Sequence, residues 1–345
     1  MSRATLSVII PNYNHGLYIA EALQAIVDQS LPPFEVIVVD DASTDDSVAV
    51  IESFARRHPR VRLLRNERNI GAARSADRAL RESAGDFVIC PSADDKSMPG
   101  LFEKSIDMLT RHPQAGLCAS LGILLDPSGE ILGPISVPAT FQEPCYISPE
   151  EFFRTWERFG SFFVTQTVVF RRAALLEAGG YHADLACATD GFLNVVIPAR
   201  HGMCFIPEPL AMWRKLDESH AVRAGKSGGA LRMLESLYSR FTDPRFAPLF
   251  PEGFLPRWKR LCILGAYYGL EALSAPTREK AQLLAAIPEP RPSDILMRRL
   301  LGYRLPSGLM RLLTKGYLFS NLPAVERRRI LLSKLRSLAG GGACR

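Results

Sequence analysis

The sequence predicts an α/β fold in which a mostly parallel sheet is flanked by helices. Runs suited to buried strands alternate with helical patterns four times in about the first hundred residues, as in βαβ units. The strand runs are short, apolar and rich in β-branched residues, which is typical of strands buried on both faces. The composition, 47% hydrophobic and 23% charged, is that of a globular chain.

The predicted elements follow one another in a regular order. Pro32 and Pro33 end the first helix, and Pro99 with Gly100 opens a later one. Crossovers between the parallel strands should be right-handed. Strands are expected at residues 6–11, 35–40, 61–65 and 87–91, a hairpin at residues 124–131, and helices at residues 17–29, 45–57, 71–84 and 192–199. A C-terminal helical extension is expected at residues 231–241, 256–273, 277–287, 293–301 and 325–338.

Charge is distributed unevenly along the chain. Residues 231–345 carry 20 Lys and Arg against 8 Asp and Glu, whereas residues 1–230 carry 22 against 28. A basic segment of this kind fits nucleic acid, anionic lipid or an acidic partner, and charge alone does not choose among them. The seven cysteines are widely spaced and form no CxxC pair, so neither a disulfide framework nor a zinc site follows. With no signal-peptide pattern and no membrane-spanning run, a cytoplasmic protein is expected.

Two of the predicted strands end in adjacent acids. Asp94 and Asp95 follow the run FVICPSA, and Asp40 and Asp41 close the run EVIVVDD. Because the carboxyl ends of parallel strands meet at one edge of a sheet, all four carboxylates should lie there. Adjacent carboxylates repel each other unless a cation or a donor lies between them, and oxygen ligands suit Mg or Mn. A metal that binds an anionic ligand is therefore favoured, with turn formation and helix capping as the alternative.

Known phosphate-binding motifs are missing from this edge. The first turn, PNYNHG, contains no GxGxxG. Residues 224–227, AGKS, end like a Walker A loop, but His220 stands where its first Gly belongs and no strand of the parallel series precedes it. A bound diphosphate would therefore need a metal.

Several segments together resemble the inverting family 2 glycosyltransferases with the GT-A fold. They are PNYNHGLYIAEAL, EVIVVDDASTDDS, NIGAAR and FVICPSADDKSMPG, followed by VVFRRAALLEAGGY and ATDGFLNVVIPARHG. The resemblance is in family order over about two thirds of the chain. It implies a GT-A domain at residues 1–224, with a nucleotide-sugar-binding half at 1–115 and an acceptor half at 116–224. Residues 225–345 would form a basic helical region.

The resemblance also implies roles for the residues of the donor site. Pro11 and Tyr13 match positions that hold the nucleotide base, and the Tyr13 ring can stack on it. Asp41 matches the acid that binds the base or ribose. Arg74 is a candidate for the diphosphate, or else a solvated helix charge. Asp94 and Asp95 match the motif that binds the diphosphate through Mn or Mg.

Asp190 matches the general base that deprotonates the acceptor hydroxyl. On sequence alone, Asp190 is equally suited to cap the helix that follows it. Two positions depart from the family pattern. Ser92 stands where many members have a further Asp, and Leu216 stands where many have a His available to metal or phosphate.

The resemblance implies an enzyme that moves a sugar from a UDP-, GDP- or dTDP-sugar to a hydroxyl acceptor, with inversion. The acceptor is expected to be a cell-surface polysaccharide or a lipid-linked oligosaccharide. Basic amphipathic helices in residues 225–345 would allow peripheral association with the inner membrane face. No nucleic-acid-binding module is present. A non-catalytic nucleotide-sugar-binding partner of another glycosyltransferase is the alternative.

Overall fold

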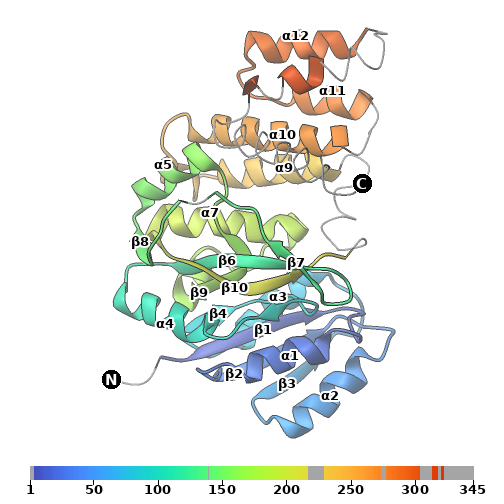
Figure 1. Cartoon of the computed structure of the whole chain (residues 1–345), viewed down its shortest axis with the longest axis vertical. Coiled ribbons are helices and arrows are strands. Elements are labelled where there is room, and N and C mark those ends of the chain that lie inside the picture. Colours follow the sequence, from blue (N-terminus) through green and yellow to red (C-terminus); the bar gives the residue numbers. More distant parts are fainter. Residues whose placement is uncertain are drawn as a thin grey trace, which may run out of the picture. The chain divides into compact units, whose positions relative to one another are not determined.

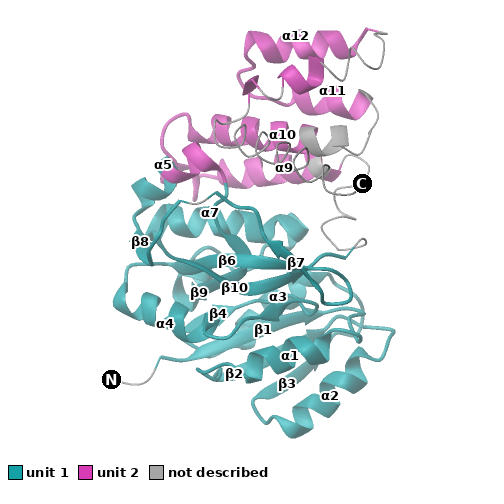
Figure 2. Ribbon diagram, in the orientation of Figure 1, with its two compact units in different colours: residues 1–154, 161–223 teal, residues 155–160, 224–345 magenta. Residues whose placement is uncertain are grey.

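The structure is a computed structural model that describes residues 4–138, 140–216, 229–272, 277–303, 313–317 and 320–321. The chain divides into two compact units (Figure 2). Unit 1 consists of residues 1–154 and 161–223, and unit 2 consists of residues 155–160 and 224–345.

Unit 1 is built on one sheet with the strand order β3-β2-β1-β4-β9-β6-β10-β5, to which β7 and β8 add at β6 and β10 (Figure 1). The first four strands pair in parallel, which confirms the predicted parallel sheet of the first half. Beyond them, β9 pairs antiparallel with both β4 and β6. The strands are β1 (Leu6–Asn12), β2 (Glu35–Asp40), β3 (Val61–Arg65), β4 (Phe87–Ile89), β5 (Lys96–Ser97), β6 (Leu117–Leu125), β7 (Ile131–Pro134), β8 (Cys145–Ile147), β9 (Val164–Arg171) and β10 (Met203–Arg214).

Helices cover both faces of the parallel strands. The helices α1 and α2 pack against each other on one side, and α3 packs on β1 and β2 from the other side (Figure 1). This is the arrangement that right-handed crossovers produce. The helices of this part of the chain are α1 (Ile19–Val27), α2 (Ser47–Arg57), α3 (Ala72–Glu82), α4 (Leu101–Arg111), α5 (Pro149–Phe159), α6 (Arg172–Glu177), η1 (Ala183–Ala188) and α7 (Thr189–His201).

Burial on both faces explains the apolar strand sequences. In β1, Val8 and Ile10 face one side, Ile9 faces the other, and all three are fully buried. The observed β2 and β3 have the predicted limits, and β6 with β7 forms the predicted hairpin. The strand predicted at residues 87–91 is shorter, ending at Ile89, because the chain turns away before Pro91, which has no N–H to donate to a ladder.

Unit 2 is helical in its described part, as predicted. Its elements are α9 (Gly229–Phe241), η2 (Ala247–Leu249), α10 (Phe254–Ala272), α11 (Thr277–Ala285) and α12 (Pro292–Leu301). Asp294 is buried in this unit and accepts hydrogen bonds from Arg260 Nη2 at 2.6 Å and from the Tyr317 hydroxyl at 2.7 Å. No helix in the described ranges is long and apolar enough to cross a membrane. The helix predicted at residues 325–338 lies outside the described residues.

Candidate active site

The candidate site lies at the carboxyl ends of the parallel strands. Asn12 ends β1 and Asp40 ends β2, and the carboxylate pair Asp94 and Asp95 follows β4 after a short loop. The strand order places β1 between β2 and β4. The sheet therefore brings both acid pairs to one edge, as the sequence predicts.

Both carboxylate oxygens of Asp40 accept hydrogen bonds from within the protein. Its Oδ2 accepts hydrogen bonds from Asn12 Nδ2 at 2.9 Å and from the Ser43 hydroxyl at 2.6 Å, and its Oδ1 accepts from the Ser43 backbone N–H at 3.0 Å. The side chain is buried beneath this network. Asp40 thus orders the loop after β2, and the expectation of a cation at this edge depends on the second pair, Asp94 and Asp95.

Asp41 fastens the loop after β3 to the end of β2. Its Oδ1 accepts hydrogen bonds from Asn66 Nδ2 at 2.7 Å and from the Ile70 N–H at 2.9 Å, and its Oδ2 accepts from the Gly71 N–H at 2.8 Å. A carboxylate has about four acceptor positions, so about one remains open for a ligand. With only 2% of its surface exposed, Asp41 has at most that one position open to a ligand.

Tyr13 and Arg74 present their side chains to solvent beside this carboxylate network. Tyr13 follows β1 and is 40% exposed, and Pro11 in β1 is half-buried. The loop is held by Asn14, whose N–H donates to the Ser43 hydroxyl at 2.9 Å. Arg74 lies in the first turn of α3, where its Nη1 donates to the Ile70 carbonyl at 3.2 Å. A planar ring and a guanidinium are thus available for a base and a phosphate.

Asp94 and Asp95 have the donor set and the electrostatics of a cation site. Asp95 is 4% exposed, and its Oδ1 accepts a hydrogen bond from the Arg214 backbone N–H at 2.8 Å. Its Oδ2 is buried and makes no hydrogen bond of normal geometry with the described residues. Burial, followed by the charge of Asp94, raises the pKa of Asp95 well above its usual value, against the lowering effects of the Arg214 N–H and the Ser92 hydroxyl.

The two carboxylates fit a divalent cation, with further ligands supplied from elsewhere. A cation would satisfy the buried Oδ2 of Asp95 and relieve its repulsion from Asp94. Within the described ranges no cluster of three or more metal-ligating side chains is found. The remaining ligands would therefore be phosphate oxygens and water, as is usual for Mg²⁺ at substrate phosphates. The departures Ser92 and Leu216 are in the described part, whereas His220 and residues 224–227 lie outside it.

Asp190 lies in the first turn of α7, and its environment is unusual for a carboxylate. Burial raises the pKa of Asp190 from 3.8 to about 6. Its charge adds to burial in raising the pKa values of Cys90, directly after β4, and of Tyr181. Asp190 is therefore within electrostatic reach of the strand end that carries Asp94 and Asp95. A carboxylate with a pKa close to neutral is suited to proton transfer.

The alternative role of Asp190 as a helix cap is wrong. The residue at the N-cap of α7 is Ala188, and no side chain makes a capping hydrogen bond there. Thr189 is already the first residue of α7, and its hydroxyl accepts a hydrogen bond from the His182 backbone N–H at 2.9 Å. Helix capping therefore does not explain why an Asp stands at position 190.

Arg214 is a site residue that the sequence pattern did not single out. Besides its N–H bond to Asp95, its Nε donates to the Asp94 carbonyl at 3.0 Å and its Nη2 donates to Glu21 Oε2 at 2.6 Å. These partners lie 119 to 193 positions away in the sequence, and no local motif reveals them. The sequence signal that could have revealed Arg214 is a single Arg at the end of a long apolar strand, because a buried guanidinium needs partners within the protein.

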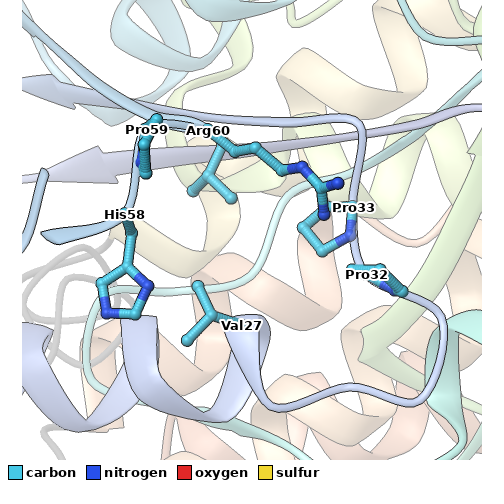
Figure 3. Close-up of a pocket in the computed structure, with 7 residues that line it drawn as sticks. Val27, Pro32, Pro33, His58, Pro59 and Arg60 are labelled. Atoms are coloured by element: carbon cyan, nitrogen blue, oxygen red, sulfur yellow. The ribbon is translucent and has the colours of Figure 1, made fainter.

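A cavity of about 240 Å³ lies at the amino ends of the parallel strands, opposite the candidate site (Figure 3). It is lined by Val27 at the end of α1, by Val36 near the start of β2, and by the segment 58–60 before β3. Pro32 and Pro33 close it, and its wall is mostly apolar. Neither acid pair is among its lining residues, so it is separate from the candidate site.

Comparisons with known proteins bear on the whole arrangement. Residues 7–176 match the family model described as glycosyl transferase family 2. The Bacillus subtilis protein TuaG, named for glycosyl transfer in teichuronic acid biosynthesis, is 34% identical over 104 residues. That match covers 30% of this chain and 41% of TuaG, so less than half of the relative's length is spanned.

Two solved structures share the fold at low sequence identity. The crystal structure of S. aureus TarS 1–349 in complex with UDP has a TM-score of 0.62 and 18% identity, and the match covers 95% of this chain and 91% of that chain. The mannosyltransferase PcManGT from Pyrobaculum calidifontis, in complex with GDP-Man and Mn²⁺, has a TM-score of 0.50 and 21% identity, with 95% and 88% covered.

Proposed function

The chain belongs to glycosyl transferase family 2 and has the GT-A fold of its structural neighbours, and on this premise we propose a specific reaction for it. The protein moves one sugar from a nucleotide-sugar donor to a hydroxyl acceptor with inversion of configuration. The observation that carries the proposal is Asp190, a partly buried carboxyl whose pKa is raised to about 6, near the strand end that presents Asp94 and Asp95, where the Oδ2 of Asp95 has no hydrogen-bond partner among the described residues.

The donor binds along the carboxyl ends of β1, β2 and β4. The exposed Tyr13 ring stacks on the base, and Pro11 shapes the end of β1 beneath it. Asp41 accepts a hydrogen bond from the base or ribose through its remaining acceptor position and orders the turn at residues 69–71. Arg74, exposed in the first turn of α3, contacts the diphosphate. Donors of the UDP-, GDP- and dTDP-sugar classes fit this arrangement.

Asp94 and Asp95 hold the divalent cation, Mn or Mg. When bound, the cation neutralises charge that develops on the leaving diphosphate. The observation in favour is the buried Oδ2 of Asp95, which no protein donor in the described ranges satisfies, together with the raised pKa of that carboxyl. A cation accompanies the donor in the structural neighbour PcManGT, which was solved in complex with GDP-Man and Mn²⁺.

Asp190 is the general base. Its ionised carboxylate accepts the proton of the acceptor hydroxyl while the hydroxyl oxygen forms a bond to the anomeric carbon of the donor sugar. The bond from that carbon to the diphosphate breaks in the same step, and the nucleoside diphosphate leaves with the bonding electrons. Because attack and departure take place on opposite faces, one displacement inverts the configuration.

The acceptor is a growing cell-surface polysaccharide or a lipid-linked oligosaccharide, and the protein works in the cytoplasm at the inner membrane face. The basic C-terminal helices provide the contact. In α12, Leu296 is 59% exposed and lies about one turn before the exposed Arg299. Arg298 is exposed as well, and Tyr303 just beyond the helix is 67% exposed. The acid of this helix, Asp294, is buried and paired with Arg260, so it does not oppose an anionic surface.

Calorimetry with UDP, GDP, dTDP and their sugars, with and without Mn²⁺, tests the donor site. Metal-dependent binding of one base is the expected result, and no binding to any member of the panel would refute the site. Asp190→Asn should lower turnover by about 10²- to 10⁴-fold and leave donor binding nearly unchanged. Unchanged turnover would refute the assignment of Asp190 as the base. Donor binding without any turnover by the wild type would favour the alternative, a non-catalytic nucleotide-sugar-binding partner of another glycosyltransferase.

A further inference from the structure

Arg214 is a buried cation beside the proposed metal site. Its side chain is 2% exposed, so its donors must find partners within the protein. Nε donates to the Asp94 carbonyl at 3.0 Å, Nη1 to the Pro127 carbonyl at 3.0 Å, and Nη2 to Glu21 Oε2 at 2.6 Å. The guanidinium carbon lies 4.8 Å from the centre of the Tyr18 ring.

None of these side-chain contacts is with a carboxylate oxygen of Asp94 or Asp95, although the charge of Arg214 still acts to lower the pKa of Asp95. The side chain contacts Asp94 at its backbone carbonyl, and Arg214 contacts the carboxylate of Asp95 through its backbone N–H. Its formal charge is paired with Glu21. A guanidinium paired with Asp94 or Asp95 would compete with a metal for the same oxygens.

Glu21 also forms an ion pair with a second basic side chain. Its Oε1 forms an ion pair with Lys96, the residue directly after Asp95, while its Oε2 binds Arg214. Both oxygens of Glu21, which lies in the first turn of α1, are thus occupied by two basic residues, one next to Asp95 in sequence and one that contacts Asp94 and Asp95. The Lys96 side chain is 23% exposed, so it has room to adopt other rotamers once released.

The turn between β6 and β7 fixes Arg214 from the other side. The carbonyls of Asp126 and Pro127 accept from Nη1 at 3.4 and 3.0 Å. Gly129 in this turn has a φ of +97°, and a Cβ there would lie 3.4 Å from Nη1. The guanidinium is therefore held by these carbonyls as well as by its carboxylate partner.

From this geometry we propose that Glu21 is a positioning residue for the metal site. It neutralises Arg214 and withholds Lys96, and so leaves the carboxylates of Asp94 and Asp95 to a divalent cation. The inference rests on the proposed function, because the cation is the one that the donor diphosphate would share. Loss of the Glu21 charge leaves Arg214 in place with its charge unpaired, and it frees Lys96 to turn toward the carboxylates. Both changes oppose the binding of a cation.

Glu21→Gln and a matched control test the proposal. The control is Glu208→Gln, because Glu208 is a half-exposed Glu that pairs with Lys104, and its exposure is close to that of Glu21. Mn²⁺ is titrated into each variant with whichever of UDP, GDP or dTDP the wild type binds. The same nucleotide is also titrated without metal, and the thermal midpoint of the metal-free protein is recorded.

Glu21→Gln should weaken Mn²⁺ binding by about tenfold, in the range of residues that support metal ligands. Metal-free binding of the diphosphate should be unchanged or tighter, because the site becomes more positive. A folding defect would weaken both, so a loss that is confined to Mn²⁺ binding identifies the positioning role. Arg214→Gln in the Glu21→Gln background should restore part of the Mn²⁺ affinity by removing the unpaired charge.

Equal Mn²⁺ affinity in the wild type and Glu21→Gln, with the wild type binding its nucleotide, would overturn this inference alone. A parallel loss of metal-dependent and metal-free binding would overturn it as well, since that is the signature of a structural role. Absence of nucleotide binding by the wild type would overturn the proposed function and the inference together. Glu208→Gln should match the wild type throughout.

Discussion

Gly71 donates its backbone N–H to Oδ2 of Asp41 at 2.8 Å, across 30 positions of sequence. The donor stands at the start of α3 and the acceptor directly after β2. Because Ile70 donates to the other oxygen at 2.9 Å, one carboxylate orders the whole turn. Any role of Asp41 toward a nucleotide is therefore combined with a structural role, and the two can be separated by experiment.

Asp41→Asn should destabilise the protein. An amide offers one oxygen where the carboxylate offers two, so at least one of the N–H groups of Ile70 and Gly71 loses its acceptor. A fully buried donor without a partner costs about 1–3 kcal/mol, and because these two groups are partly buried the lower end of that range is expected. We expect a lower thermal midpoint, measured by circular dichroism. The control is Asp107→Asn, in an exposed pair with Arg111 that contributes about 0.3–0.5 kcal/mol. Equal midpoints for the two variants would contradict the role of Asp41 in this turn.

Tyr13→Ala should weaken donor binding, whereas Tyr13→Phe should preserve it. Stacking of a base on an aromatic ring is worth about 1–3 kcal/mol, which corresponds to about 5- to 150-fold in affinity. The ring is exposed and free to stack, and the phenolic oxygen is not needed for stacking. Calorimetry with the cognate nucleoside diphosphate measures the difference. If Tyr13→Ala binds as tightly as the wild type, the base lies elsewhere.

The rate of transfer should rise with pH through about pH 6. Burial raises the pKa of Asp190 from 3.8 to about 6, and a general base works only when it is ionised. At one pH unit below this pKa the rate should be about a tenth of its plateau. The profile of kcat/KM between pH 4 and pH 8 measures this, with Asp190→Asn as a flat and low reference. A plateau that continues to about pH 4.5 would rule out Asp190 as the group that titrates.

Asp95→Asn should stabilise the metal-free protein while abolishing metal-dependent binding. Burial and the neighbouring charge of Asp94 raise the pKa of Asp95, so its ionised form at neutral pH is unfavourable in the fold. The amide keeps an acceptor for the Arg214 N–H and removes the charge. A higher thermal midpoint without metal, together with nucleotide binding that no longer responds to Mn²⁺, is expected. A lower midpoint would show that the carboxylate is satisfied without a cation.

The exposed face of α12 should bind anionic vesicles. Each basic residue near an anionic surface contributes about 1 kcal/mol, so Arg298→Gln with Arg299→Gln should reduce binding by about 30-fold. Sedimentation with vesicles of phosphatidylcholine, with and without phosphatidylglycerol, measures the effect. The matched control replaces the exposed pair Arg56 and Arg57 of α2. Equal losses in the two double variants would indicate an effect of net charge rather than of α12.

The parallel half of the fold could be predicted from sequence because its signals are local. The limits of β2 and β3 follow from short apolar runs between turns. The place of β9 between β4 and β6 could not be read in this way, since it depends on antiparallel pairing between strands far apart in the chain. The second, helical unit was predictable in its described helices because their apolar positions recur with helical spacing.

In the candidate site, too, the residues that stand in local sequence motifs could be predicted and those that depend on long-range contacts could not. Asp94, Asp95 and Asp190 stand in motifs that a single sequence displays. Glu21 and Arg214 carry no motif of their own, because their roles come from contacts with each other and with a loop across 120 to 193 positions. The different contacts of Asp40 and Asp41 could not be predicted either. Only the structure shows that Asp40 is the acid whose carboxylate accepts hydrogen bonds from Asn12 and Ser43.

The strand β10 has a consequence for how the chain can be divided. The family model recognises residues 7–176, but β10 (Met203–Arg214) pairs with β5, β6 and β8 and supplies the N–H that binds Asp95. A truncation at residue 176 would keep both carboxylates and remove the strand that anchors them. The segment that the family model matches is therefore shorter than the smallest fragment that could be expressed and assayed. That fragment must extend at least through Arg214.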